Sequence, residues 1–514
     1  MTCLPLRHSA ISLALIVLLT GCAVGPDHQR PQLPETKGYS PGILPEVMPA
    51  ADQRILPGRD IQADWWTLFE SKELNALIEK ALAAHPTIEA AQASLQAAQA
   101  NVLAQRGFFS PTVGAGYQRT RTKIAANLGG NSPGLQGDGS VISTGESETE
   151  PFATPVIYNF HTAQLTVGYN LDVFGGLRRE GESLEALAEV EYMQLQAARI
   201  TLATNIVAAA IEGASLRRQL QLTQETITAN EALVELARRQ HKAGYASRLD
   251  YVVQENALAQ ARQTLPPLQR QFEQNRNLLR QLAGNPQDAD VHLFELDALR
   301  LPQELPLSLP SQLIEQRPDV RAAEAQLHAA TAQVGVARAA RLPQFNIAAN
   351  WGGAASHFSQ MFWSSGKFFE IGATIAGTLF DGGTLRYREK SAQATMRQAA
   401  AQYKTTVLTA YQNVADALQA VHADAKALEA AAHAEGTSRE AMNLTRRQHQ
   451  RGYLDRLALI KAEQDWRQAR LALTQAQAVR LGDAATLFQA LGGGWWQRPA
   501  EADSMLASKP SVSD

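Results

Sequence analysis

The stretch Arg447-Gln-His-Gln-Arg-Gly-Tyr-Leu-Asp-Arg-Leu457 has a near copy upstream, Arg239-Gln-His-Lys-Ala-Gly-Tyr-Ala-Ser-Arg-Leu249. Each copy lies between two long segments rich in Ala, Gln and Leu and contains one glycine. Glycine just after a helical run, followed by Ser or Asp before the next apolar-periodic run, is typical of a helix end, a turn and a new helix start. The sequence therefore predicts two helical hairpins, which bend near residues 241–249 and 449–457.

The two hairpins belong to two copies of one larger unit. His85-Pro-Thr-Ile-Glu-Ala-Ala-Gln-Ala-Ser-Leu95 matches Arg317-Pro-Asp-Val-Arg-Ala-Ala-Glu-Ala-Gln-Leu327 at an offset of 232 residues (318 − 86). The bends match at an offset of 208 residues (452 − 244), so the first copy has the longer insertion. A duplication on this scale organises the whole fold. We expect a first repeat at 61–283, a linker at 284–310, a second repeat at 311–492 and a C-terminal tail at 493–514.

Between the predicted helices of each repeat the hydrophobic period changes from 3.6 to 2, which indicates strands. We expect them at about 112–122 and 161–174 in the first repeat, and at about 344–353 and 369–380 in the second. Such alternation fits a membrane strand and a soluble half-buried strand equally well. A long loop rich in Gly, Ser and Asn (127–148) and an aromatic cluster between Phe358 and Phe369 favour the membrane.

The number of predicted strands has a consequence for assembly. Four strands cannot close a barrel, and open sheet edges are not tolerated in lipid. If these are membrane strands, several chains must share one barrel, and a trimer would supply twelve strands. The expected fold class is mainly α with a membrane β portion, built from a duplicated unit of two strands and a long helical hairpin.

Two segments, about 178–240 and 384–448, carry a helical pattern that is broken by nothing stronger than Gly213. Some 65 residues at 1.5 Å each make a helix of roughly 95–100 Å. Apolar and small residues follow the spacing of a coiled-coil seam along the first segment: Leu195, Ala198, Leu202, Ile206, Ala209, Gly213, Leu216 and Leu220. A solid coiled coil and a hollow cylinder of hairpins both satisfy this pattern.

The first residues are typical of a secretory signal peptide, with Arg7 and His8 before an apolar core that is too short to span a bilayer. The core ends in Leu19-Thr-Gly-Cys22, which looks like a bacterial lipobox. Cys22 is therefore expected to become an acylated N-terminus, the alternative being an ordinary signal peptide with an incidental cysteine. We expect a signal peptide at 1–21, an extended lipidated tether at 22–60 and no transmembrane helix in the mature chain.

Composition and motifs argue against several functions. The formal net charge is −3, and without a basic excess or stripe the chain is not expected to bind nucleic acid. The sequence contains no HExxH, P-loop, paired-cysteine or nucleophile-elbow motif, so we expect no enzyme, no cofactor and no bound metal. His241 and His449 recur at the bends and would suit a metal-efflux duct, although the repeat itself explains their recurrence.

Taken together, these features resemble the outer-membrane efflux factors, in the OprM/NodT-like lipoprotein branch of the TolC family. The resemblance covers nearly the whole chain from Cys22 to Trp496; besides the lipobox and the duplication it rests on Leu171-Asp-Val-Phe-Gly175, Phe380-Asp-Gly-Gly383 and Leu487-Phe-Gln-Ala-Leu-Gly-Gly-Gly-Trp495. It implies a homotrimer, lipid-anchored in the outer membrane, whose twelve-stranded β-barrel continues as a periplasmic α-helical barrel. It also implies a periplasmic adaptor protein and an inner-membrane transporter of the resistance-nodulation-division type as partners in exporting drugs or other small toxic compounds.

The resemblance further assigns site residues. The hairpin bends form the periplasmic end in this family, so Gly244, Tyr245, Gly452 and Tyr453 would be the tips that dock the adaptor. The alternative is that the two tyrosines only pack the turns. A type I protein secretion duct shares the architecture and remains an alternative function. A passive coiled-coil spacer would explain the anchor and the helices but not the strands.

In OprM-like proteins a ring of leucines and a ring of aspartates close the aperture just past the second tip. Leu457 keeps the leucine, whereas the aspartate position, nine residues after the tip glycine, is Lys461 here. Asp455 and Asp250 are further candidates for the aperture carboxylate, and Asp455 or Glu463 is a candidate partner of the lysine. A ring of unpaired lysines would favour anions, so the cation preference of the family is not expected to carry over.

Overall fold

The computed structural model describes residues 23–32, 39, 53–123, 157–284, 294–308 and 310–497. The chain divides into two compact units, and each unit collects segments that are distant in the sequence. Unit 1 combines residues 1–29, 99–186 and 328–397, and unit 2 combines residues 30–98, 187–327 and 398–514. The predicted signal peptide, Cys22 and the loop 127–148 lie outside the described residues.

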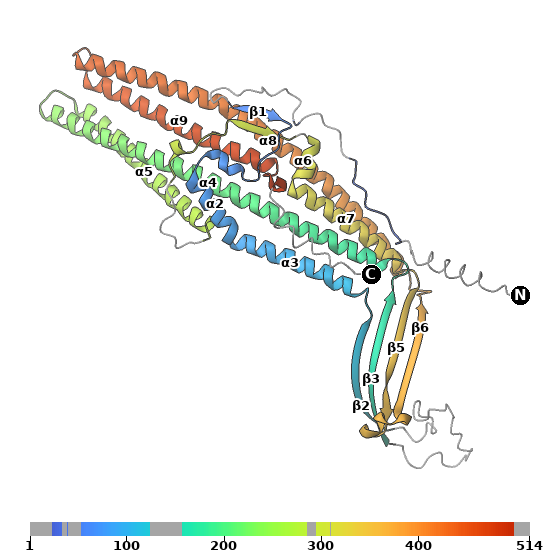
Figure 1. Cartoon of the computed structure of the whole chain (residues 1–514). Helices are drawn as coiled ribbons and strands as arrows, with labels where there is room; N and C mark the ends of the chain where they lie inside the picture. The colour runs from blue at the N-terminus through green and yellow to red at the C-terminus, as the bar shows by residue number, and fades with distance from the viewer. Residues whose placement is uncertain are drawn as a thin grey trace, which may run out of the picture. The chain divides into compact units, whose positions relative to one another are not determined.

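Unit 1 contains an antiparallel sheet with the strand order β2-β3-β5-β6 (Figure 1). Its strands are β2 (Thr112–Lys123), β3 (Ile157–Leu171), β5 (Gln344–Ala355) and β6 (Lys367–Ala376). The strand pair of each repeat therefore joins the other along β3 and β5. β3 ends three residues before the expected position because the Asp172 carboxylate accepts hydrogen bonds from the N–H groups of Leu177 and Arg178, which starts the next helix.

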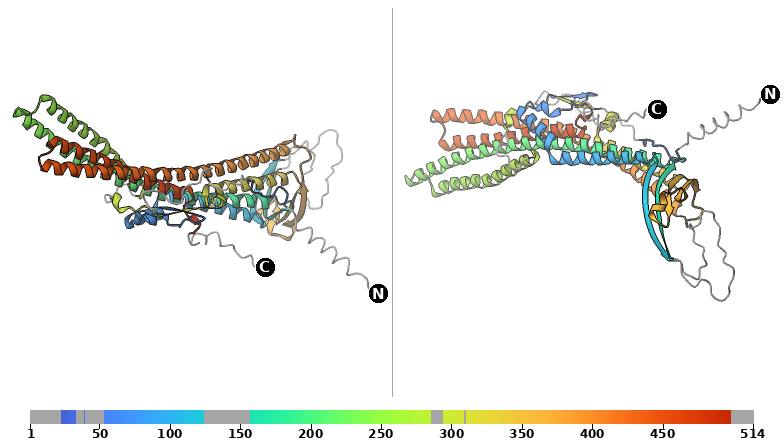
Figure 2. Two further views of the ribbon diagram at one scale, coloured as in Figure 1. Left: turned by 90° about the horizontal axis from the view of Figure 1, so that it is seen from above. Right: turned by 60° about the horizontal axis from the view of Figure 1, so that its bottom comes forward.

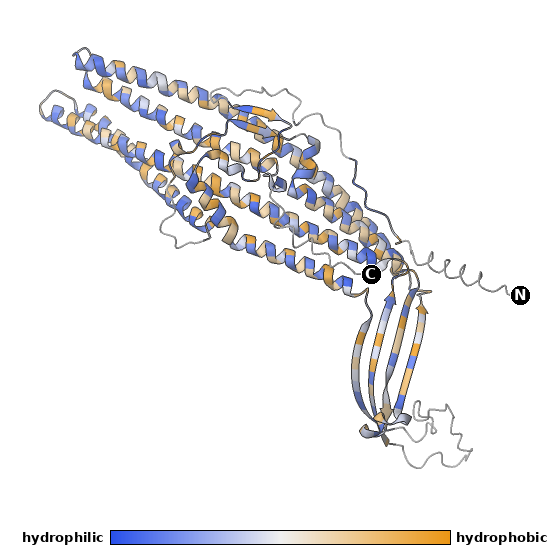
Figure 3. Ribbon diagram, in the orientation of Figure 1, coloured by the Kyte–Doolittle hydropathy of each residue, from blue (hydrophilic) through white to orange (hydrophobic). Residues whose placement is uncertain are grey.

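The register of the sheet gives it two different faces, because successive side chains of a strand point to opposite sides. One face carries mainly apolar cross-strand rows, such as Leu165–Trp351–Phe369 and Val167–Ala349–Ile371. The opposite face carries rows such as Thr166–Asn350–Glu370. Figure 3 shows the alternating hydropathy along the strands. Trp351, Phe369 and Ile371 are exposed in the single chain, so this sheet presents a large apolar surface.

The two predicted hairpins run through unit 2. The first is α4 (Gly176–Lys242) with α5 (Arg248–Leu282), and the second is α8 (Thr384–Gln450) with α9 (Arg456–Ala490). The two hairpins lie beside each other, and their bends are at the same end of the unit (Figure 2). α5 contains Pro266 and Pro267 in its interior, whereas α9 contains no proline. The seam predicted for α4 is largely buried, with Leu202, Ile206 and Leu216 in the interior.

The remaining helices belong to the duplicated pattern or connect it. α3 (Pro86–Gly107) and α7 (Pro318–Ala339) are the matched helices of the two repeats, and each begins with proline, which suits a first helical turn. The other helices are short: α2 (Lys72–Ala84), α6 (Pro310–Gln316), η1 (Trp65–Phe69), η3 (Leu296–Ala298), η4 (Phe358–Phe362), η5 (Ser364–Gly366) and η6 (Trp495–Gln497). None of the helices that the structure describes combines the length and the apolar composition of a membrane-spanning segment.

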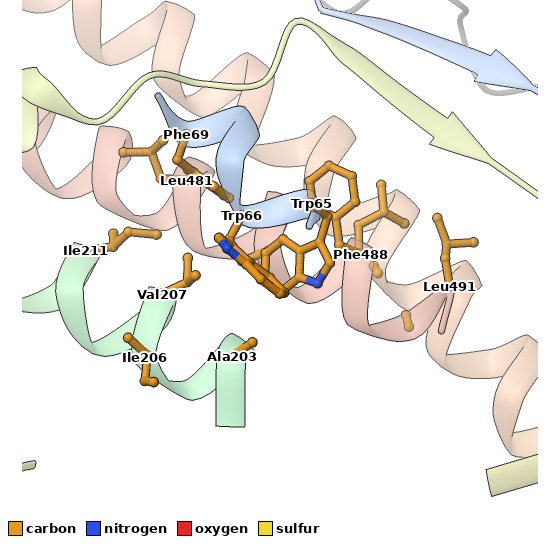
Figure 4. Close-up of a cluster of buried hydrophobic side chains, with 14 of the residues drawn as sticks. Trp65, Trp66, Phe69, Ala203, Ile206, Val207, Ile211, Leu481, Phe488 and Leu491 are labelled. Carbon is orange, nitrogen blue, oxygen red and sulfur yellow. The ribbon is translucent and has the colours of Figure 1, made fainter. Parts of the chain in front are cut away.

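The core of unit 2 is built around the tryptophans of η1. The Trp65 indole stacks on the ring of Phe488 from α9, with 5.3 Å between the ring centroids. Side chains of α4 and α9 surround these rings, including Val207 and Leu481 (Figure 4). A short segment near the start of the folded chain thus holds one helix of each hairpin through apolar contact.

A short parallel pairing differs from the sequence-based expectation. β1 (Arg54–Pro57) lies within the predicted tether and pairs with β4 (Glu304–Leu307) from the predicted linker. Gln53, just before β1, is fully buried, and its side-chain oxygen accepts a hydrogen bond from Arg480 of α9. Residues 53–57 are therefore part of the folded body rather than a free tether. The two strands have only four residues each and start 250 positions apart (304 − 54), so no local pattern marks them.

Candidate functional site

The two hairpin bends have the same backbone geometry. In the first bend, the N–H of Tyr245 donates to the Gln240 carbonyl over 2.8 Å, and the N–H of Gly244 donates to the His241 carbonyl over 3.0 Å. The second bend repeats both bonds, from Tyr453 to Gln448 over 2.9 Å and from Gly452 to His449 over 3.0 Å. This is the Schellman pattern, in which the residue after the helix adopts positive φ. Gly244 and Gly452 have φ of 77° and 80°.

The recurring histidines belong to this turn geometry. Nδ1 of His241 lies 3.0 Å from the carbonyl oxygen of Ala246, and Nδ1 of His449 lies 3.0 Å from that of Leu454. A carbonyl oxygen only accepts hydrogen bonds, so each Nδ1 carries the proton and donates across the bend. Each histidine therefore links the end of one helix to the residue that precedes the N-cap of the next helix. Their recurrence follows from two copies of one turn, and it does not require a metal.

Both acidic candidates act as helix caps. Asp455 is the N-cap of α9, and its carboxylate accepts from the N–H of Ala458 over 2.8 Å. Asp250 forms a capping box with Ser247 at the start of α5. Two hydrogen bonds lower the pKa of Asp250. The larger effect comes from the Ser247 hydroxyl and the smaller one from the Ser247 backbone N–H. Both carboxylates are thus engaged in starting a helix, and their assignment to the aperture stays a prediction.

The tips present apolar side chains outward. Tyr245 is 87% exposed and Tyr453 is 77% exposed in the single chain, so neither ring packs its own turn. The alternative explanation for these tyrosines, that they only fill the bends, does not fit this geometry. Leu249 and Leu457, each four residues further along the chain in the first turn of the next helix, are 70% and 57% exposed. Each bend therefore carries an exposed tyrosine followed by an exposed leucine.

Lys461 is exposed on α9, and within the described chain it forms no ion pair with either carboxylate proposed as its partner. Glu463 instead lies 3.4 Å from Arg446 and 3.5 Å from Arg467. Asp455 is occupied by the helix cap. Among the described residues, neither of these two carboxylates therefore neutralises the lysine charge near the second tip.

Polar contacts join the two hairpins along α4 and α9. The Gln464 amide donates to Asn230 over 2.9 Å, Arg470 lies 3.3 Å from Glu225, and Gln475 lies 3.5 Å from Gln219. We call these three pairs the inter-hairpin seam. The sequence analysis did not predict the inter-hairpin seam, because the two residues of each pair are 234 to 256 positions apart and each is an ordinary polar residue on a helix.

A family model described as outer membrane efflux protein matches residues 77–285 and 309–493. The chain belongs to the outer membrane efflux protein family. The residues between the two matched segments, 286–308, lie within the predicted linker 284–310, and the bounds of the two repeats stay a prediction. This family consists of channel and efflux proteins rather than enzymes.

Members of the family with curated names are similar over nearly the whole chain. The pyoverdine export outer membrane protein OpmQ of Pseudomonas putida strain KT2440 is 29% identical, over 90% of this chain and 94% of that protein. The probable efflux pump outer membrane protein TtgC of the same strain is 29% identical, over 98% and 99%. The solved outer-membrane channel OprN is 26% identical with a TM-score of 0.77, over 92% of this chain and all of that chain. The fold and the efflux-factor character are thereby established for this efflux protein.

Proposed function

We propose that the protein is the outer-membrane channel of a tripartite efflux pump, a passive gated conduit for small toxic compounds. The observation that carries this proposal is a channel-family fold over nearly the whole chain, with two hairpins whose exposed tips lie at one end. The named relatives export pyoverdine or belong to efflux pumps. Small organic compounds are therefore the proposed cargo. The chain performs no chemistry, and an inner-membrane transporter of the resistance-nodulation-division type supplies the energy.

The two-faced sheet supports a membrane role. Its apolar face would contact lipid and its polar face would line an aqueous path. Within the described residues, β2 and β6 each pair on one side only, and such edges are not stable in lipid. Three chains that join edge to edge would give twelve strands and leave no free edge. This requirement supports a barrel shared by several chains, and the family resemblance supports three as their number and a periplasmic barrel of helices continuous with the strands.

The lipobox supports anchoring of the mature chain through an acylated Cys22 at the periplasmic side of the outer membrane. The exposed Tyr245 and Tyr453 support docking of a periplasmic adaptor at the tips, because aromatic side chains are favoured contacts at protein interfaces. Leu457 and Lys461 follow the second tip and are proposed to form the constriction of the closed aperture. Asp455 precedes Leu457 by two residues, and Asp250 follows Leu249 at the start of the second helix of the first hairpin; both are proposed to contribute to the same aperture.

The decisive experiment measures single-channel conductance of the purified lipidated protein in a planar bilayer, with the oligomeric state determined from the same preparation. A trimer with a small, asymmetrically gated conductance is expected. A monomer or dimer without conductance would overturn the shared-barrel proposal.

The gate is tested in the same assay. The double substitution Leu457→Ala and Lys461→Gln should raise the closed-state conductance, because it removes the bulk and the charge of the constriction. Leu444→Ala is the matched control, since it removes an exposed leucine from α8 before the bend and should leave the conductance unchanged. Equal conductance of the double variant and the wild type would place the constriction elsewhere.

A further inference from the structure

The first described residues are fixed to unit 1. The N–H of Val24 donates to the carbonyl of Phe174 over 3.1 Å, where β3 leads into α4. The Arg179 guanidinium donates to the Val24 carbonyl over 3.4 Å and to the Asp27 carboxylate over 2.7 Å. The Arg179 side chain is almost completely buried. A buried arginine that bonds both the backbone and a carboxylate holds this segment in one place.

Ala23 sits against the turn that leads into α4. A Cβ added at Gly175 would lie 2.6 Å from the Cα of Ala23, a distance that real side chains do not reach. Gly175 also has φ of 76°. The turn thus has glycine where the N-terminal segment approaches most closely. The residue predicted to carry lipid, Cys22, is one peptide bond before Ala23.

A cavity of about 460 Å³ opens at the same turn, between the end of β3, the start of α4 and the ends of α3 and α7. This volume lies within the range of about 300–1,000 Å³ that small-ligand pockets occupy. Its apolar lining includes Phe108, Val173, Phe174, Val336, Ala340 and Pro343. Phe174 therefore both lines the cavity and binds the N-terminal segment.

The cavity lining has five polar side chains, of which four are bonded within the protein and the fifth is Asn170. The Glu180 carboxylate accepts from the Gln333 amide over 3.0 Å. Gln105 donates to the Leu177 carbonyl over 3.3 Å, and Asp172 accepts from the N–H of Leu177 over 3.0 Å. Gln344 donates to the Leu342 carbonyl over 3.0 Å. With these groups satisfied by the fold, the cavity offers a ligand mainly hydrocarbon surface. It suits an apolar chain better than a polar solute.

We propose that this cavity binds one acyl chain of the lipid carried by Cys22 of the same subunit. The inference rests on the proposed lipidation. Covalent attachment next to Ala23, which is held at the cavity-lining turn, gives the acyl chain a high effective concentration there. A free membrane lipid would have to bind without this advantage. The bound chain would fasten the junction of β3 and α4 to the anchor.

The test uses full-length protein from cells fed a palmitate analogue that bears a photoreactive diazirine. Intact mass first shows whether the analogue is attached to the protein. After irradiation of the membranes, peptide mass spectrometry locates the cross-links. We expect a cross-link that joins the Cys22 peptide to peptides containing residues 105–108 or 336–343.

Ala340→Trp, an exposed position in the lining, should fill the cavity and reduce this cross-link several-fold. Ala104→Trp, an exposed position of α3 outside the lining, is the control and should leave it unchanged. If the attached acyl chain cross-links only to bilayer lipid, the inference is wrong while the lipidation stands. A lining peptide that carries the mass of an intact phospholipid would show a membrane lipid as the occupant. Protein of unlipidated mass would refute both the lipidation and the inference.

Discussion

The glycines of the two bends show how one residue determines a hairpin. Gly452 has φ of 80°, and a Cβ added there would meet nothing within 4 Å. Any penalty for a side chain at this position therefore comes from the backbone and not from a clash. For an L-residue the left-handed conformation costs about 1–2 kcal/mol. The same reasoning applies to Gly244, which occupies the equivalent position of the first hairpin with φ of 77°.

Gly452→Ala should consequently loosen the bend. The reporter is hydrogen exchange of the Tyr453 amide, which donates to Gln448 across the turn. We expect its exchange to become about ten-fold faster, in line with a loss of about 1–2 kcal/mol. Gly436→Ala is the matched control, because Gly436 lies inside α8 and a Cβ there also meets nothing within 4 Å. In a helix interior alanine is favoured over glycine by about 1 kcal/mol, so amide hydrogen exchange near residue 436 should become slower. Faster exchange in both variants would argue against the backbone explanation.

A second feature at the residue scale is a pair of carboxylates beside the buried Arg480. Asp483 of α9 lies near Asp424 of α8. The pKa of Asp483 is raised to about 7, first by burial and then by the hydrogen bond and the negative charge of Asp424. The positive charge of Arg480 opposes this shift by lowering the pKa. Arg480 itself is fully buried and donates to the carbonyl of Val421 and to Gln53. The contact between the two helices thus includes an acid that titrates near neutral pH.

The sign of the resulting pH dependence follows from linkage. The folded protein binds a proton at Asp483 up to about pH 7, whereas the unfolded chain releases it near its ordinary value of 3.8. Stability from this site is therefore highest below about pH 4 and decreases as pH rises towards 7. Asp483→Asn should remove this decrease, so that between pH 5 and 8 the variant loses a few degrees less in apparent Tm than the wild type. Asp465→Asn, an exposed change on the same helix, should follow the wild type. Parallel curves for wild type and Asp483→Asn would contradict the assignment.

Among the elements, the hairpins were the most predictable, because each is encoded by contiguous sequence. Helical periodicity, a glycine and a capping residue lie within a few positions of one another at each bend. The strands were also evident from the alternation of apolar and polar residues. Their exact ends depend on helix-capping residues such as Asp172, which the hydrophobic periodicity does not reveal. The β1–β4 pair, the inter-hairpin seam and the Arg480–Gln53 contact could not be predicted, since their partners are far apart in the sequence and chemically unremarkable. The aperture assignment of Leu457, Lys461, Asp455 and Asp250 stays a prediction. The cap at Asp455 agrees with the helix start expected after Gly452, whereas the capping box between Asp250 and Ser247 was not foreseen.

The inter-hairpin seam is the element that opening would disturb. If opening separates the tips of α4 and α9, the contacts of the seam stabilise the closed arrangement. Arg470→Gln removes one charged contact between hairpins, that with Glu225. This substitution should raise the closed-state conductance by up to about five-fold. The factor corresponds to the loss of an exposed ion pair, which contributes about 0.2–1 kcal/mol to the closed arrangement.

The control for this prediction is Arg262→Gln. Arg262 lies 2.8 Å from Glu231, so it forms a similar ion pair, but between α5 and α4 of one hairpin. Its loss should leave the conductance unchanged. If both variants conduct equally, separation of the hairpins is not what opens the channel.

At the scale of the whole molecule, the described chain leaves its β-sheet incomplete. The apolar face of the sheet is exposed, and β2 and β6 have one unpaired side each. Both deficits disappear in a closed barrel shared by three subunits within lipid. The proposed threefold assembly would also bring three copies of each tip residue towards one axis, so that a single lysine per chain would become a ring of three charges.

The proposed ring of Lys461 would give the assembled channel a measurable property. A constriction lined by one sign of charge concentrates the opposite ion. Because Lys461 has no intramolecular carboxylate partner among the described residues, the wild-type channel should favour chloride over potassium more than the Lys461→Gln variant does. Lys461→Asp should shift the preference to potassium. The reversal potential across a planar bilayer with a KCl gradient measures both. Lys426→Gln, which removes an exposed charge of α8 far from the tip, should leave the potential unchanged. Identical potentials for wild type and Lys461→Asp would mean that the lysines do not line the narrowest part of the path, and the constriction would then have to be sought in the leucines alone.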